Sequence, residues 1–203
     1  MIFYEAEKYF RYSVYEEYMN KADELCSHSG ATENLSRILL KNLEEAGYGF
    51  SGKKRVIVKI ASRYHDIGKL IDAKDHPEKG VEWMKKHKEA IMKMIHDEID
   101  VDNNHTAKKM FKTICKIIKH HKKIGKLKSD YKYALLGHVV YVADKIAKLY
   151  KSSDVEFRKK AYKKAEKKIK WLYDQGRIKH AELRVFMEVL KKAREDGLEL
   201  END

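Results

Sequence analysis

The stretch KKRVIVKIASRYHDIGK, residues 53–69, decides between a helical and a mixed fold. Four β-branched residues near its start would suit a strand. Apolar residues nevertheless keep helical spacing from Ile57 to Tyr64, and the sequence offers no second strand-like run to pair with them. We therefore predict a helix that carries His65 and Asp66 at its C-terminal end.

The segments on either side of this stretch also favour helices. The chain has one proline and only ten glycines among 203 residues, so few residues break a helix. Residues 32–47 place four aliphatic side chains on one stripe, with Thr32 as the expected N-cap and Gly47 just past the end. Residues 3–20 are compatible with a separate helix, and His28 lies between the two.

Polar residues interrupt the apolar stripes of the later predicted helices. Residues 76–95 have helical spacing, with a proline at a position suited to the first turn. In residues 106–121 the apolar stripe continues one turn on to His121. Asp144 interrupts the otherwise apolar residues 131–150, where a lone carboxylate is costly unless it has a partner.

The last fifty residues predict a helical hairpin, formed by residues 156–175 and 177–195 on either side of Gly176. We predict an all-α fold, with a helical bundle over residues 1–150 and a C-terminal helical extension over 151–203 packed on the same domain. The residues expected to face one another in the hairpin are Phe157, Ala161, Ile169 and Leu172 on the first helix and Ile178, Val185, Phe186 and Val189 on the second.

Composition restricts the compartment and the partners. With 44 basic and 32 acidic residues the chain carries a net charge of +12, which favours partners that carry phosphate. The two cysteines are too few for a disulfide framework. No apolar run is long enough to cross a bilayer, and the N-terminus has charges where a signal peptide would be apolar. We expect a soluble, cytoplasmic protein that binds no membrane.

Residues 47–54, GYGFSGKK, resemble a phosphate-binding loop only in their letters. A dinucleotide fingerprint follows a strand, whereas this one follows a predicted helix. A Walker A loop needs Ser or Thr after its lysine, and Lys54 occupies that place. We interpret the segment as a turn between two helices.

Histidines and aspartates recur in a fixed order along the helical segments. Imidazole and carboxylate groups are ligands that divalent transition metals accept. A lone histidine on an apolar face is more often a hydrogen-bonded core residue than a ligand, so the order and the acidic partners carry the argument. His87, for example, we interpret as a core or surface residue. The candidates are His28, His65, Asp66, His76, His120, His121 and Asp144.

The order of these motifs resembles the HD superfamily of metal-dependent phosphohydrolases, over roughly residues 20–150. The resemblance implies a helical bundle with a five-helix core that holds one or two metal ions. The motifs that carry it are His28, HDIGK at residues 65–69, His76, HH at residues 120–121 and ADK at residues 143–145.

The resemblance also assigns roles to the candidates. It implies that Asp66 bridges two metal ions and that Lys69 is the cation that contacts the phosphate. About forty residues separate His76 from the HH pair, more than compact members leave, so His96 or His105 are alternatives to His76. The implied ligands of the first metal are His28, His65, Asp66 and Asp144, and those of the second are His76, His120 and His121 together with Asp66.

The ligand types fit two divalent ions, with Mn, Ni, Co, Fe or Mg as candidates. Two ions about 3.5 to 4 Å apart can acidify a shared water and clamp phosphoryl oxygens as charge builds in the transition state. No covalent nucleophile is then needed. Lys69 would add positive charge opposite that developing charge.

The sequence after the HH pair favours one branch of the superfamily. Branches that cleave cyclic dinucleotides follow their HH with a glutamate and a Gly-Tyr-Pro element, which residues 120–133 lack. The stand-alone HD nucleases of CRISPR effector systems carry the same set of motifs, cut single-stranded DNA or RNA, and work beside a separate helicase. Lysines that could line a polynucleotide path cluster around the pair: Lys116, Lys119, Lys122, Lys123, Lys126, Lys128 and Lys132.

We therefore predict a CRISPR-associated, two-metal nuclease that acts on single-stranded DNA or RNA, in partnership with a helicase and an effector complex. A phosphohydrolase of mononucleotides or small cyclic nucleotides would use the same ligands and is the alternative enzyme. A third reading is a binding protein with a structural metal, although a structural site would not need Lys69. The lysine cluster could also be an ordinary solvated face.

Overall fold

The computed structural model describes residues 16–99, 104–127 and 133–195, and these form an all-α structure without a strand. The element order is α2 (Glu16–Glu45), α3 (Gly52–Tyr64), η1 (Ile67–Leu70), α4 (His76–Lys86), α5 (Lys88–Glu98), α6 (Asn104–His120), η2 (Ile124–Lys126), α7 (Ala134–Ala147), η3 (Lys148–Tyr150), α8 (Val155–Asp174) and α9 (His180–Glu195), where η marks a single 3₁₀ turn. The predicted all-α fold is confirmed.

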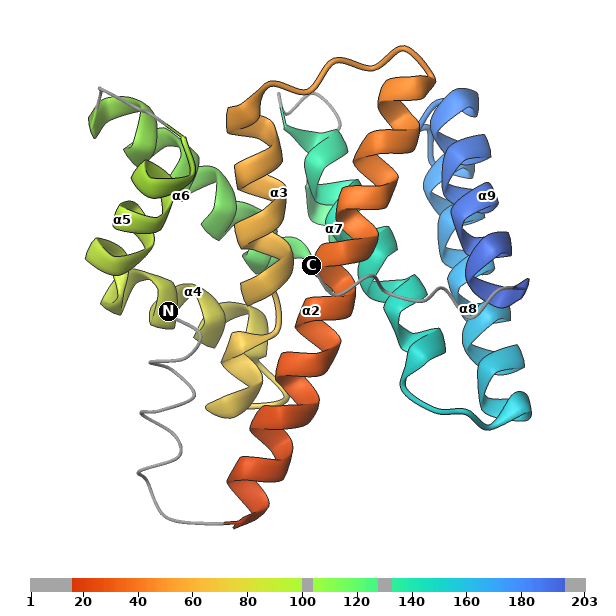
Figure 1. Cartoon of the computed structure of the whole chain (residues 1–203), viewed down its shortest axis with the longest axis horizontal. Coiled ribbons are helices and arrows are strands. Elements are labelled where there is room, and N and C mark those ends of the chain that lie inside the picture. Colours follow the sequence, from red (N-terminus) through yellow and green to blue (C-terminus); the bar gives the residue numbers. More distant parts are fainter. Residues whose placement is uncertain (1–15, 100–103, 128–132, 196–203) are drawn as a thin grey trace.

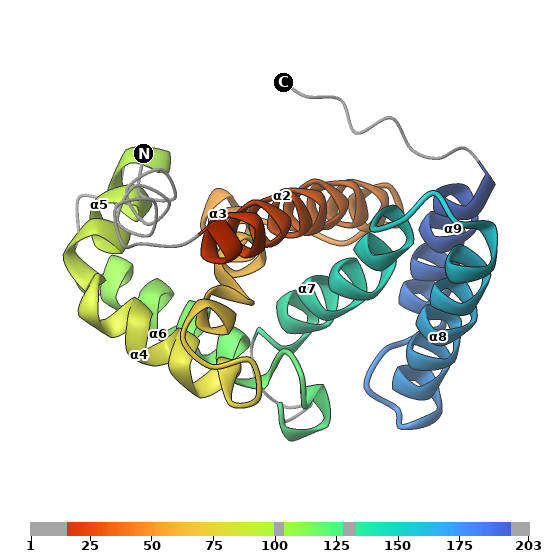
Figure 2. The ribbon, with the colours of Figure 1, turned by 90° about the horizontal axis from the view of Figure 1, so that it is seen from below.

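Helices α2, α3 and α7 form the centre of the molecule (Figure 1). Helices α4, α5 and α6 lie on one side of this centre, and α8 and α9 pair on the other side (Figure 2). In α7 only Leu135 and Lys145 are not buried, as expected for a helix covered from several directions. The side chains at the C-terminal half of α7 therefore face the middle of the bundle.

The deciding stretch is helical, as predicted. Helix α3 ends at Tyr64, and His65 and Asp66 follow at its C-terminal end. The side chains of Ile57, Ile60 and Tyr64 are almost completely buried, which explains why the helix wins over the strand propensity of this segment. Of the predicted turn, residues 47–51 connect the two helices, whereas residues 52–54 already belong to α3.

The predicted start of a helix at Thr32 is wrong. Thr32 does not cap a helix but lies inside the single helix α2, where its hydroxyl donates a hydrogen bond to the carbonyl oxygen of His28 (2.8 Å). Packing against α7 buries both residues and keeps the chain helical through a stretch of weak helix formers. Gly47 ends the helix with φ of 92°, as predicted. Residues 3–15 of the predicted first helix lie outside the described residues.

The C-terminal hairpin is confirmed, with one departure. Helices α8 and α9 pack on each other, and α8 also packs along α7. Phe157, which we expected inside the hairpin, is 41 % exposed because it lies on the outer side of α8. The division of the chain near residue 150 stays a prediction. Among the described helices, none combines the length and the apolar character needed to cross a bilayer.

Gly68 is fixed by a close approach between η1 and α4. A Cβ atom at this position would lie 2.0 Å from the carbonyl oxygen of His76 and 2.4 Å from the backbone nitrogen of Gly80. Both atoms belong to backbone, so neither can move without shifting a whole element. The glycine of the HDIGK motif therefore allows η1, which carries Lys69, to pack directly on the start of α4, which carries His76.

We expect Gly68→Ala to destabilise the protein by about 3 kcal/mol, since relief of the clash must separate η1 from α4. Chemical denaturation of the metal-free protein measures this. Gly30→Ala is the matched control, because a Cβ atom there would have no described atom from another element within 4 Å, and alanine favours the helix by about 0.5 to 1 kcal/mol. Equal stabilities of the two variants would show that η1 and α4 are not in close contact.

His138 is a buried residue of α7 whose two ring nitrogens have no hydrogen-bond partner among the described residues. Burial, and then the nearby Arg177, lower its pKa from 6.5 to about 4. Below about pH 6.5 the imidazole of His138 is protonated in the unfolded chain but stays neutral in the folded one. The free energy of unfolding is therefore unaffected by this group above pH 6.5 and decreases as the pH falls toward 4.

His138→Leu should remove this acid sensitivity. At pH 7.5 the variant is expected to be more stable by about 1 kcal/mol, because leucine leaves no unsatisfied polar atom. Its advantage should grow toward pH 4 by up to about 3 kcal/mol. Urea unfolding of metal-free protein between pH 7.5 and 5 checks this. A stability difference that does not change with pH would place the imidazole in contact with water.

Candidate metal centre

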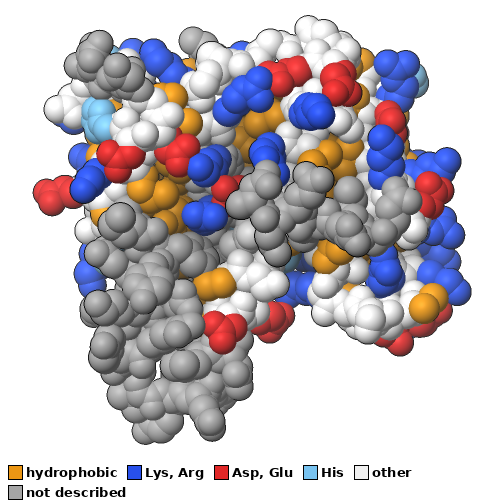
Figure 3. Space-filling view, in the orientation of Figure 1, with side chains coloured by type: hydrophobic (Ala, Val, Ile, Leu, Met, Phe, Trp, Pro, Cys, Tyr) orange, Lys and Arg blue, Asp and Glu red, His pale blue; other side chains and the backbone are white. Residues whose placement is uncertain are grey.

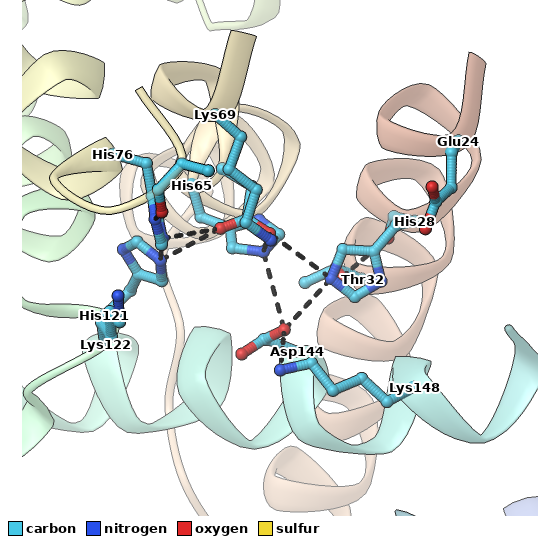
Figure 4. A network of polar contacts seen from close by, with 12 residues as sticks. Glu24, His28, Thr32, His65, Lys69, His76, His121, Lys122, Asp144 and Lys148 are labelled. Atoms are coloured by element: carbon cyan, nitrogen blue, oxygen red, sulfur yellow. Dashed lines mark hydrogen bonds and ion pairs between the residues drawn. The ribbon is translucent and has the colours of Figure 1, made fainter. Parts of the chain in front are cut away.

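Two groups of buried side chains meet at the end of α3 and share Asp66. The first group is His28, His65, Asp66 and Asp144, and the second is Asp66, His76 and His121. In each group one possible ligand atom per residue lies within 4.8 Å of all the others. Figure 4 shows these side chains converging from α2, the end of α3, the start of α4, the end of α6 and α7.

Three of the histidines are oriented in the same way. The Nδ1–H of His65 donates to the carbonyl oxygen of Ser62 (2.7 Å), and that of His121 donates to Ile118 (2.6 Å). Both acceptors are carbonyls of the last helical turn, which have no partner within the helix. His76 repeats the pattern in the turn before α4, with the carbonyl oxygen of residue 73 at 2.9 Å.

These backbone hydrogen bonds decide which nitrogen faces the centre. A carbonyl oxygen only accepts, so Nδ1 must carry the proton, and Nε2 of a neutral ring is then a bare lone pair. The Nε2 atoms of His76 and His121 face each other at 3.1 Å, and each lies 3.2 Å from Oδ1 of Asp66. Lone pairs and carboxylates this close repel unless a cation lies between them. The donor set therefore fits a metal ion, and the carbonyls play the orienting role usual around metal-binding histidines.

Asp66 divides its two oxygens between the groups. Its Oδ2 lies 3.3 Å from Nε2 of His65 and 3.7 Å from Nε2 of His28, whereas Oδ1 faces the second group. Asp144 completes the first group, with Oδ1 at 3.1 Å from Nε2 of His28. The carboxylate of Asp66 is thus in the position of a bridging ligand.

The charges in the centre are strongly coupled. Burial alone would lower the pKa of His65, but the carboxylates of Asp66 and Asp144 raise it to about 9. For Asp66 burial works toward a higher pKa, and the surrounding histidines, His65 first, outweigh it and hold the pKa far below its usual value. Burial lowers the pKa of His28 and of His121. Without a metal, a protonated His65 is therefore one of the cations that balance the two buried carboxylates.

Three lysines border the carboxylates. Lys69 of η1 forms an ion pair with Oδ2 of Asp66, and Lys145 forms one with Oδ2 of Asp144. Lys148, one turn beyond Asp144, lies 3.4 Å from its Oδ1 and is 36 % exposed. Lys69 was predicted from the HDIGK motif, whereas Lys145 entered only as part of ADK. Lys148 was not predicted, although its i,i+4 spacing from Asp144 was a usable signal.

The structure does not bring every predicted ligand into the centre. Of the HH pair only His121 joins a group, while His120 is half-buried and lies outside both. Adjacent helical residues point about 100° apart, so both rings cannot face the same point easily. At the second group the structure places His76, and not His96 or His105.

The comparisons with known proteins agree with this arrangement. A family model described as HD domain matches residues 25–179, which includes all residues of both groups. No curated protein and no solved structure matches the chain. The match covers well over half of the 203 residues, which supports a metal-dependent hydrolase, and the chain therefore belongs to the HD domain family.

Proposed function

We propose that the protein is a two-metal phosphodiesterase that cleaves single-stranded nucleic acid. The observation that carries the proposal is the division of the Asp66 oxygens between two groups of histidines whose Nε2 atoms face inward. Divalent ions bound there would activate a water and neutralise phosphoryl oxygens. In this proposal His28, His65, Asp66 and Asp144 hold one ion, and His76, His121 and Asp66 hold the other.

The chain's own cations would orient the substrate. Lys69 is one-third exposed beside Asp66, where its ammonium group can donate to a phosphoryl oxygen seated at the centre. Lys148 borders Asp144 on the other side of the centre. Two cations on opposite sides would fix the phosphate between them and stabilise the charge that builds on its oxygens.

The electrostatic surroundings support a polyanionic substrate. Burial first, and then Lys119, Lys116 and Lys126, lower the pKa of His120, which is a sign of positive potential beside His121. Lys122 and Lys123 follow directly and are exposed. Of the predicted lysine cluster, Lys128 and Lys132 lie outside the described residues. A polynucleotide offers such a surface several phosphates at once, whereas a mononucleotide offers few.

The proposed biological setting is a CRISPR effector system, in which a separate helicase supplies the single strand. It rests on the resemblance of the motif order to stand-alone HD nucleases and on the absence of a Gly-Tyr-Pro element after the HH pair. A nucleotide phosphohydrolase would use the same ligands and is the alternative that the assay must separate.

The test is a substrate panel. Purified protein is incubated with labelled single-stranded and duplex DNA, with RNA, and with mono- and cyclic nucleotides, in Mn, Ni, Co or Mg and with a chelator control. We expect cleavage of single strands that the chelator stops and added metal restores. Hydrolysis of nucleotides without cleavage of any polymer would overturn the nuclease proposal and favour the alternative.

A further inference from the structure

Helix α8 carries an exposed stripe of lysines between two aromatic residues. The five residues, here named the α8 stripe, are Phe157, Lys160, Lys164, Lys168 and Trp171, and their spacing of three and four places them on one side of the helix. Phe157 is 41 % and Trp171 37 % exposed, and the three lysines are exposed. Lysine and arginine side chains gather along the edge of the molecule where α8 and α9 lie (Figure 3).

The α8 stripe differs from an ordinary solvated lysine face. Elsewhere on the helix Lys170 pairs with Glu166 at 2.7 Å, whereas no lysine of the stripe forms an ion pair with any residue the structure describes. Like charges four residues apart destabilise a helix, and exposed aromatic rings leave apolar surface in water. Both costs fall if a polyanion with flat rings covers the stripe.

The stripe continues toward the metal centre. At its end Trp171 lies over the 3₁₀ turn η2, since a Cβ atom on Gly125 would be 3.2 Å from the tryptophan ring. The turn follows His121 after only two residues, Lys122 and Lys123, and both are exposed. The end of the stripe therefore contacts a turn that lies, along the chain, only two exposed lysines away from His121, a candidate ligand of the second group.

We propose that the α8 stripe binds a single strand of nucleic acid and leads it over η2 to the metal centre. The lysines contact phosphates, and Phe157 and Trp171 provide rings on which unpaired bases stack. The stripe spans about 21 Å along the helix axis, which accommodates several nucleotides. This inference deepens the proposed nuclease function and rests on it for its purpose, but the binding itself is measured without catalysis.

Tryptophan fluorescence gives a specific readout. The chain has two tryptophans, and Trp83 is 7 % exposed and stacked on Tyr64 with ring centroids 5.5 Å apart. Only Trp171 can meet a base directly. In chelator, to prevent cleavage, a 20-nucleotide oligothymidylate or oligouridylate should quench the fluorescence as it binds. Trp171→Phe should abolish the quenching and keep most of the affinity, because phenylalanine still stacks.

Two variants with the same change in net charge distinguish binding at the α8 stripe from a general effect of the protein's positive charge. Lys160, Lys164 and Lys168 are replaced by Gln in one variant, and Lys108, Lys109 and Lys112 in the other, which are exposed residues of α6 on the opposite side of the molecule. Fluorescence anisotropy should show a loss of about tenfold or more for the first variant only, with the salt dependence of log K reduced by about 2.

The outcomes distinguish the stripe from the proposed function. Equal loss in both triple variants, or no quenching of Trp171 by bound oligonucleotide, would overturn the stripe. Hydrolysis of a small diester, bis(4-nitrophenyl) phosphate, should be the same in the stripe variant and the wild type. Binding and quenching without hydrolysis of any phosphodiester would overturn the proposed function and leave the stripe supported. If the stripe variant cleaves single strands as fast as the wild type, the proposed role of the stripe is overturned and the proposed nuclease function is not.

Discussion

Replacing Asp66 with alanine is expected to abolish hydrolysis of every substrate, by at least about a thousandfold. The side chain is 2 % exposed, and its two oxygens face four histidines in two directions. Loss of the carboxylate removes the one group that both candidate sites share. We therefore expect the metal content to fall for both sites together, measured by elemental analysis after dialysis.

The fold should persist in this variant. Asp66→Asn keeps the shape of the side chain and removes only its charge, so it guards against a trivial loss of structure, and circular dichroism follows the helical content of both. His87→Ala is the control, since His87 packs on the ring of Trp83 and belongs to neither group. It should change the activity little. Activity that survives Asp66→Ala would refute the whole metal assignment.

Replacing His76 with alanine is expected to remove one metal and to leave the other. His76 contacts only the second group, so the first group keeps its four residues. We expect a metal content of one ion per chain instead of two, and a loss of at least about a hundredfold in turnover, because only one side of the phosphate is then neutralised. Elemental analysis and single-strand cleavage measure the two effects.

The matched controls are the other histidines of the same segment. His96 lies on α5 and His105 near the start of α6, and neither belongs to a group. Replacing either with alanine should leave two ions bound. An unchanged metal content in His76→Ala, together with a loss in one of these controls, would move the second site to that histidine.

Most of the fold could be predicted because its elements are amphipathic over several turns. The apolar residues from Ile57 to Tyr64 have helical spacing in the sequence, and the structure buries Ile57, Ile60 and Tyr64 on one side of α3. The false boundary at Thr32 shows the limit of local signals. A good N-cap residue has no effect on the chain where contact with a neighbouring helix, here α7, keeps the backbone helical on both sides of it.

The residues of the two groups were all among the sequence candidates, which also included His120, but the orientation of their rings could not be predicted. The order of the histidines along the chain, together with their acidic partners, indicated a metal site. The tautomers of His65, His76 and His121 could not be predicted. They depend on hydrogen bonds to the backbone carbonyl oxygen three residues earlier, and every residue type has such a carbonyl. The HH motif put both His120 and His121 among the predicted ligands, although the apolar stripe of residues 106–121 continues to His121 alone, and only His121 joins a group.

The central claim is a two-metal centre bridged by Asp66, and anomalous scattering from crystals grown with Mn²⁺ tests it most directly. We predict two peaks about 3.5 to 4 Å apart, on either side of the Asp66 carboxylate. One peak should touch the first group and the other the second. A single peak, or two peaks that Asp66 does not touch, would contradict the account.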